Sequence, residues 1–120
     1  ATARGSISFP GDGAEVITMG AVDDVGRRLA YSSCGPNSTR PKPDFVAPVP
    51  FPSYIRAQPF SGTSAAAPQG AALAALWWSR YPTWTAAHIH NVLRTSAHHL
   101  GPIGDEWETG YGLLVLPRPK

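Results

Sequence analysis

A serine near the start of an alanine-rich stretch is the residue of this sequence best placed to do chemistry. Ser64 follows Gly62 and Thr63, and the small residues after it include Pro68. Proline lacks an N–H and is tolerated in the first turn of a helix, so Pro68 predicts a helix start near 64–67. A serine at that end can point its hydroxyl outward and offer its own N–H to an oxyanion. This position suits a nucleophile, but a serine there is more often only a helix cap.

Six sequence blocks give this serine a family context. The octapeptide SGTSAAAP (61–68) closely resembles the nucleophile motif of the subtilisin-like serine peptidases, Gly-Thr-Ser-x-Ala-x-Pro. The further blocks that resemble this family are VITMGAVD (16–23), AYSSCGP (30–36), KPDFVAP (42–48), YPTWTAAHIHNVLRTSA (81–97) and GYGLL (110–114). They cover nearly the whole chain in the family's order, so the resemblance is far more specific than a chance match to the octapeptide.

The resemblance implies a fold and an organisation. It implies an α/β class, the C-terminal portion of a subtilisin-like, mostly parallel sheet with helices on both faces, completed by a missing N-terminal portion. Residues 1–120 would then be one segment of a peptidase catalytic domain and not an independent domain. The N-terminal part would be its partner, as a second chain or a cleaved fragment.

The resemblance also implies roles for residues of the motif. Ser64 would be the nucleophile that hydrolyses peptide bonds, with its N–H as one oxyanion donor. Thr63 would lie beside the oxyanion site, and Gly62 would let the substrate backbone pass close to the serine. A looser alignment assigns substrate binding to Ser61 and to three residues near the N-terminus, Ser8, Phe9 and Pro10.

Small departures from the family pattern surround the motif. Ala65 stands where the family often has Met, and Gln69 stands where His or Val is commoner. Val49 replaces the usual Gly after Ala-Pro. None of these changes removes a group that the mechanism requires.

The other catalytic groups of the family are not in this sequence. The Asp, the His and the oxyanion-hole Asn precede the six blocks in the family's chain order, so a partner or an N-terminal segment would have to supply them. Without a base in reach, Ser64 is not an efficient nucleophile. The alternative is a non-catalytic, degenerate subtilase-like interaction subunit that keeps the serine motif.

Other titratable residues are interpreted as structural. His88, His90, His98 and His99 lie in or just after one predicted helix and are expected to be surface or cap residues. Two of them, His88 and His90, diverge around that helix and do not form a zinc site. Asp12, Asp23, Asp24 and Asp44 are expected in turns. No cofactor is required, and a structural calcium near Asp23 is implied only weakly by the resemblance.

Composition excludes several classes of protein. Only 15% of the residues are charged and the net charge is +2, too little for an electrostatic nucleic-acid site. The single cysteine, Cys34, excludes an internal disulfide framework and is expected to be a small buried residue. The uncharged stretch 57–79 is strongly apolar only over 65–78, which is too short to span a membrane. By resemblance, a secreted or extracytoplasmic location is expected.

The elements that must position Ser64 are predicted to be short. The sequence contains 13 prolines and 12 glycines, which favour loops. Strands are predicted over 15–22 and 29–33, with further short ones possible over 44–47 and 53–57, and the Asn37 sequon is expected to be only a turn. A helix over 63–81, small and uncharged all round, should be buried on every side. A second helix over 86–97 should begin at a Thr85 cap, and 113–116 forms a short apolar run.

Overall fold

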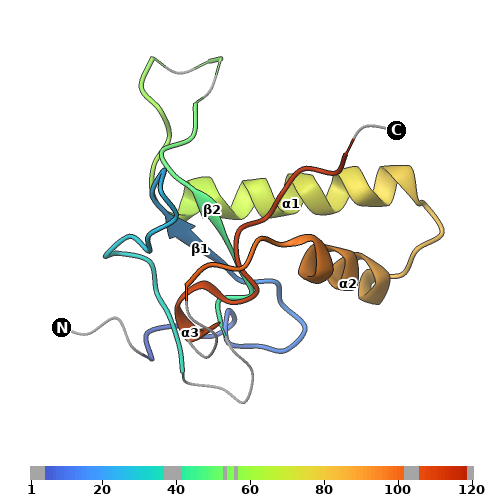
Figure 1. The fold of residues 1–120 in the computed structure, drawn as a ribbon, viewed down its shortest axis with the longest axis horizontal. Coiled ribbons are helices and arrows are strands. Elements are labelled where there is room, and N and C mark those ends of the chain that lie inside the picture. The colour runs from blue at the N-terminus through green and yellow to red at the C-terminus, as the bar shows by residue number, and fades with distance from the viewer. Residues whose placement is uncertain (1–4, 37–41, 53, 56, 102–105, 119–120) are drawn as a thin grey trace.

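Two parallel strands and two long helices form the body of the described part of the chain (Figure 1). The computed structural model describes residues 5–36, 42–52, 54–55, 57–101 and 106–118. The elements are, in chain order, β1 (Met19–Val22), β2 (Phe45–Pro48), α1 (Thr63–Arg80), α2 (Ala86–Ser96) and the single-turn α3 (Glu106–Thr109).

The strands pair in parallel, as the α/β class requires. Met19 lies opposite Phe45, and Val22 lies opposite Pro48. The segment after α3 joins the same sheet at one point, where Leu114 N donates to Val46 O at 3.2 Å. Parallel strands must be linked by long crossover connections, and these account for the distance in sequence between the three segments. The predicted α/β class is confirmed.

Both long helices cover one face of the sheet. Side chains alternate between the faces of a strand, so Phe45 and Ala47 point to the same side. Ala47 packs with Ala65 and Ala66 of α1, and Phe45 packs with residues of both helices, including Leu73, Ile89 and Leu93. On the other face, Gly20 lies close to loop atoms of Ser32 and Pro43. The described part of the chain thus has its helical core on one side of the sheet.

Helix α1 agrees with the predicted range 63–81 to within one residue, but it differs from the expectations drawn from Pro68 and from its small residues. It begins at Thr63, so Pro68 lies in the second turn and not in the first. Only Ala65, Ala66, Gly70 and Leu73 are buried along it. The expectation of a helix buried on every side is therefore wrong for this chain alone. Exposed residues of α1 include Ala67, Ala71, Ala75, Leu76 and Trp78. Within the described residues, no helix has the length and apolar character needed to cross a membrane.

Helix α2 begins where the sequence predicts. Thr85 Oγ1 accepts a hydrogen bond from His88 N at 3.3 Å, and His88 Nδ1 accepts one from Thr85 N at the same distance. These reciprocal bonds form a capping box in which histidine takes the place of the usual Glu or Gln. Stacked rings of Tyr81 and Trp84, with centroids 4.1 Å apart, occupy the turn between α1 and α2. The capping box and the ring stack together stabilise the turn between α1 and α2.

Three predicted strands are shorter than expected or absent. Only the last four residues of 15–22 are a strand, because turns occupy the preceding residues as far as Val16. The segment 29–33 forms turns, and a single antiparallel bridge links the neighbouring Arg28 to Val22. Of 53–57, residues 54 and 55 form a turn, whereas 53 and 56 lie outside the described residues. The segment instead closes through paired backbone bonds between Phe51 and Phe60, at 2.8 and 2.9 Å.

Candidate active site

Ser64 is the second residue of α1, and its side chain is exposed. The residue at the helix cap is Gly62, which makes no side-chain cap bond, so Ser64 does not serve as the cap. Gly62 has φ +86°, a left-handed conformation that other residues rarely adopt. This backbone requirement is a reason for glycine that the sequence did not reveal.

The backbone at the start of α1 leaves donors open beside the serine. Among the described residues, none accepts a hydrogen bond from the N–H groups of Thr63 and Ser64. The first N–H groups of a helix lack partners within the helix and carry the positive end of its dipole. An exposed hydroxyl therefore lies next to donors that can hold a negatively charged oxygen.

His88, the histidine nearest to Ser64 in the sequence, lies in α2, which follows the opposite end of α1. No imidazole or carboxylate of the described part of the chain hydrogen-bonds Ser64. His88 lies in the first turn of α2, beyond the far end of α1, and its ring centroid is 6.0 Å from that of Trp84. An 18-residue helix is about 27 Å long at a rise of 1.5 Å per residue, so His88 is far outside proton-transfer distance.

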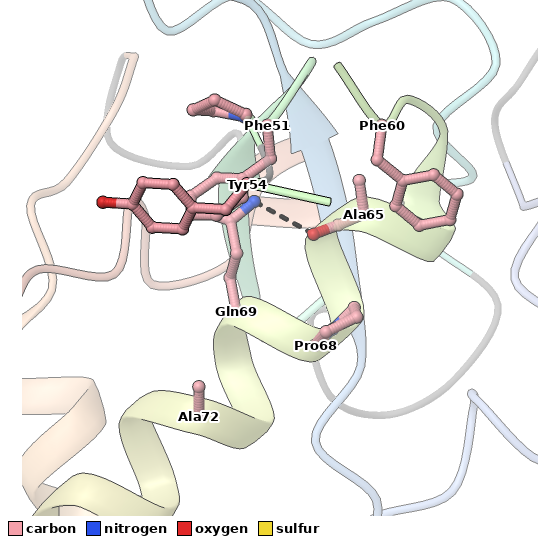
Figure 2. Close-up of a pocket in the computed structure, with 8 residues that line it drawn as sticks. Phe51, Tyr54, Phe60, Ala65, Pro68, Gln69 and Ala72 are labelled. Atoms are coloured by element: carbon pink, nitrogen blue, oxygen red, sulfur yellow. Dashed lines mark hydrogen bonds between the residues drawn. The ribbon is translucent and has the colours of Figure 1, made fainter. Parts of the chain in front are cut away.

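An apolar groove of about 590 Å³ begins at the residue after Ser64. Its α1 side presents Ala65, Pro68 and Ala72, and its other side presents aromatic residues that include Tyr54 (Figure 2). Gln69 contributes a polar group to the wall of the groove, where its side-chain amide donates to Ala65 O at 3.0 Å (Figure 2). This groove was not predicted from the sequence, although the spacing of residues 65, 68 and 72 is typical of one helix face.

The four residues predicted to bind substrate are exposed, and their role in substrate binding stays a prediction. Ser8, Phe9 and Pro10 form a turn in which Gly11 N donates to Ser8 O at 2.8 Å, and Phe9 is 87% exposed. Ser61 is also exposed. None of these four residues lines the groove beside Ser64. The Asn37 sequon lies outside the described residues.

Comparison with known proteins identifies the family. The sequence matches the Subtilase family (Peptidase_S8) over residues 1–112. The chain belongs to the subtilase family. It is 34% identical to Subtilisin DY of Bacillus licheniformis over 111 residues, which are 92% of this chain and 39% of that protein. It is 32% identical to Subtilisin E of Bacillus subtilis (strain 168), over 91% of this chain and 28% of that protein.

Solved structures agree with this assignment. The subtilase chain superimposes on a lanthipeptide protease with a TM-score of 0.71 at 23% identity, over 94% of this chain and 45% of that one. A second similar structure is MycP1, a serine protease of the type VII (ESX-1) secretion system. Its TM-score is 0.70 at 26% identity, over 90% of this chain and 32% of that one. The chain spans less than half the length of each of these relatives.

Asp23 of this subtilase is a turn residue, as predicted. Its Oδ1 accepts hydrogen bonds from Val25 N at 3.0 Å and Arg27 N at 2.9 Å. The bond from the Arg27 backbone is the main cause that lowers the pKa of Asp23 below its ordinary value. Within the described residues, no three His, Cys, Asp or Glu side chains gather to hold a metal. Backbone N–H groups already occupy Asp23 Oδ1, and the calcium near Asp23 stays a prediction.

Asp44 is not the turn residue that the sequence predicted. Its side chain is 6% exposed and pairs with Lys42, whose Nζ lies 2.6 Å from Asp44 Oδ2. His90, expected on the surface or at a cap, lies half-buried with its Nε2 3.9 Å from Asp44 Oδ1. The sequence signal for this cluster is the alternation of Lys and Asp about a proline directly before β2. Cys34, by contrast, is buried as predicted.

Proposed function

We propose that this chain supplies the nucleophile of a subtilisin-like serine endopeptidase. The observation that carries the proposal is Ser64, exposed in the first turn of α1 behind a glycine at φ +86° and beside open backbone N–H groups. Membership of the subtilase family gives this arrangement its chemistry. Peptides or proteins are the proposed substrates, and a location outside the cytoplasm fits the family.

The proposed reaction follows the general scheme of serine peptidases. Ser64 Oγ attacks the carbonyl carbon of the scissile bond while its proton passes to an imidazole. The Ser64 N–H then helps to hold the oxyanion, with Thr63 beside it. As the C–N bond breaks, the imidazole returns the proton to the leaving amine. Water hydrolyses the resulting acyl-enzyme and restores the Ser64 hydroxyl.

The imidazole and its orienting carboxylate belong, in this proposal, to another part of the same catalytic domain. We call the chain together with the segment or second chain that supplies Asp, His and Asn the assembled protease. The exposed side of α1 supports such a partner. This side carries Ala71, Ala75, Leu76 and Trp78 and no charged residue before Arg80, and an apolar surface of this kind is typical of an interface.

A fluorophosphonate probe tests the proposal because it reacts only with an activated serine. The assembled protease should be labelled, and Ser64→Ala should abolish the labelling. Ser79→Ala is the matched control, since Ser79 is an exposed serine at the other end of α1 and donates to Leu76 O. The control should be labelled like the wild type. A correctly folded assembled protease that is not labelled would instead indicate the non-catalytic interaction subunit.

A further inference from the structure

The turn that bears Ser64 lacks one of the backbone hydrogen bonds of a regular α-helix. Pro68 has no N–H, so the carbonyl of Ser64 lacks the donor that an α-helix normally places four residues later. At the cap, Gly62 O accepts a bond from Ala65 N, at 2.9 Å. A helix start that lacks one of its bonds is easier to displace than a regular one, so contacts from side chains gain importance here.

Gln69 contacts this turn from within α1. Its Nε2 donates to Ala65 O at 3.0 Å and to Pro48 O, at the end of β2, at 2.9 Å. Both hydrogens of the side-chain amide are thus used. Because both partners are carbonyl oxygens, only the nitrogen end of the amide fits there. Gln69 ties the first turn of α1 to the sheet, and the bond to Ala65 is drawn in Figure 2.

Tyr31 contacts the turn from the loop after β1. Its hydroxyl oxygen accepts a hydrogen bond from Gly62 N at 3.2 Å. This bond engages the N–H of the residue at φ +86°, two positions before Ser64. The loop that carries Tyr31 is itself held to the sheet, because Ser32 Oγ accepts a hydrogen bond from Ala21 N of β1 at 2.9 Å. Gly62 is therefore connected to β1, and Ala65 is connected to β2.

We propose that Tyr31 and Gln69 are positioning residues that hold the Ser64 turn in the geometry needed for attack. The inference rests on the proposed function of Ser64. The two side chains act on opposite ends of a four-residue turn, Gly62 and Ala65, and leave the hydroxyl of Ser64 itself unobstructed. Catalytic groups must be held to within a fraction of an ångström, and neighbouring hydrogen bonds provide this restraint.

Three variants of the assembled protease test this role. Tyr31→Phe removes the acceptor for Gly62 N and keeps the ring. Gln69→Glu keeps the shape but brings carboxylate oxygens against the carbonyls of Ala65 and Pro48. Gln58→Glu is the matched control, since Gln58 is exposed and no hydrogen bond of its side chain is recorded among the described residues. For each variant, active sites are titrated with the fluorophosphonate probe, and kcat per titrated site, KM and Tm are measured.

The positioning role predicts a loss of kcat per active site with little change in KM. A hydrogen bond of ordinary net strength corresponds to a decrease of about three- to tenfold for Tyr31→Phe, and Gln69→Glu should lose more. Gln58→Glu should match the wild type. A purely structural role would lower Tm and the number of titrated sites while kcat per site stays unchanged. That result, or an equal loss in the control, would overturn the proposal.

Hydrogen exchange separates this inference from the proposed function. The Gly62 amide should exchange faster in Tyr31→Phe than in the wild type, whether or not the protein is an enzyme. If the wild type neither reacts with the probe nor cleaves peptides, the proposed function fails, and the positioning of Ser64 for attack by these two residues fails with it. If the wild type is active but neither variant changes kcat per site or the exchange of Gly62, only the positioning role is contradicted.

Discussion

Lys42 Nζ lies 2.6 Å from Asp44 Oδ2 in the interior of the chain, with 1% and 6% of the two side chains exposed. Lys42 Nζ also donates to Val16 O at 2.6 Å, and Asp44 Oδ2 accepts a bond from Thr18 N at 2.7 Å. The pair therefore joins the segments that enter β1 and β2. These contacts help to set the register of the two parallel strands.

Removing one member of this pair should destabilise the assembled protease strongly. Lys42→Met leaves the Asp44 carboxylate buried without its cation, and Asp44→Asn leaves the ammonium without its anion. Breaking a buried ion pair in this way typically costs about 3–5 kcal/mol in the free energy of unfolding. Urea denaturation measures the loss, in a Ser64→Ala background that prevents autolysis.

The double variant is the control for this prediction. With both charges gone, Lys42→Met together with Asp44→Asn leaves no unpaired ion, and the amide oxygen introduced by Asp44→Asn remains an acceptor for Thr18 N. The double variant should therefore lose less stability than the sum of the two single variants. Additive losses would show that the two charges do not stabilise one another.

Gly62→Ala should damage activity more than stability. A side chain at φ +86° costs on the order of 1–3 kcal/mol, and the backbone relieves this strain by moving the turn that holds Ser64. A displacement of about 1 Å at a catalytic group lowers the rate by on the order of 100-fold. Thus kcat/KM on a peptide substrate should fall by about 10- to 100-fold.

Gly101→Ala is the control for Gly62→Ala, because it introduces a similar backbone strain at another glycine. Gly101 has φ +77°, and an added Cβ would meet no atom of the described residues within 4 Å. Tm should decrease by a similar amount in the two variants. Gly101→Ala should nevertheless keep its activity, because Gly101 is not in the Ser64 turn. Equal losses of activity in the two variants would contradict a specific role of Gly62.

Elements with strong local signals were predictable from the sequence. Thr85 before an amphipathic stretch gave the start of α2, and Pro82 gave the end of α1 to within one residue. The strand signal over 15–22 was too long, because Val16 ends a turn and Ile17 lies in irregular backbone before β1. Periodicity alone does not distinguish a strand from such an extended loop.

The site was predictable only as far as the motif extends. The octapeptide placed Ser64 at the start of a helix, but Pro68 suggested too late a start, because a proline can also occupy the second turn when a bond is lost. The hydrogen bonds of Tyr31 and Gln69 to this turn join residues that are far apart in sequence or that have no motif. Likewise, the ion pair of Asp44 with Lys42 was not predicted, because the alternation of Lys and Asp about Pro43 does not by itself indicate that either side chain is buried.

The chain expressed alone should be aggregation-prone or molten. The exposed side of α1 includes Leu76 and Trp78, at 44% and 43% exposure, and groove residue Tyr54 is fully exposed. Apolar surface of this extent favours association and binds hydrophobic dyes. The isolated 120-residue chain should therefore increase the fluorescence of ANS and show no cooperative thermal transition. Analytical ultracentrifugation measures whether the chain is monomeric. A cooperative thermal transition of a monomeric chain would contradict this prediction and would show that residues 1–120 fold independently.

The turn at Asp23 should stabilise the assembled protease at pH values above the ordinary pKa of aspartate, and this stabilisation should disappear in acid. Bonds from the backbone N–H groups of Arg27 and Val25 favour the charged carboxylate and lower its pKa below the ordinary value of 3.8. A lowered pKa means that the charged group's contribution to stability is complete above pH 3.8 and disappears as the pH falls through the lowered pKa.

Asp23→Asn should therefore be less stable than the wild type at about pH 6, and the difference in stability should shrink below pH 3.8. Asp24→Asn is the matched control, because it changes the exposed neighbouring residue and leaves both backbone bonds to Asp23 in place. A side-chain titration by NMR in which Asp23 titrates at or above 3.8 would contradict the prediction, because the turn would then not favour the charged form.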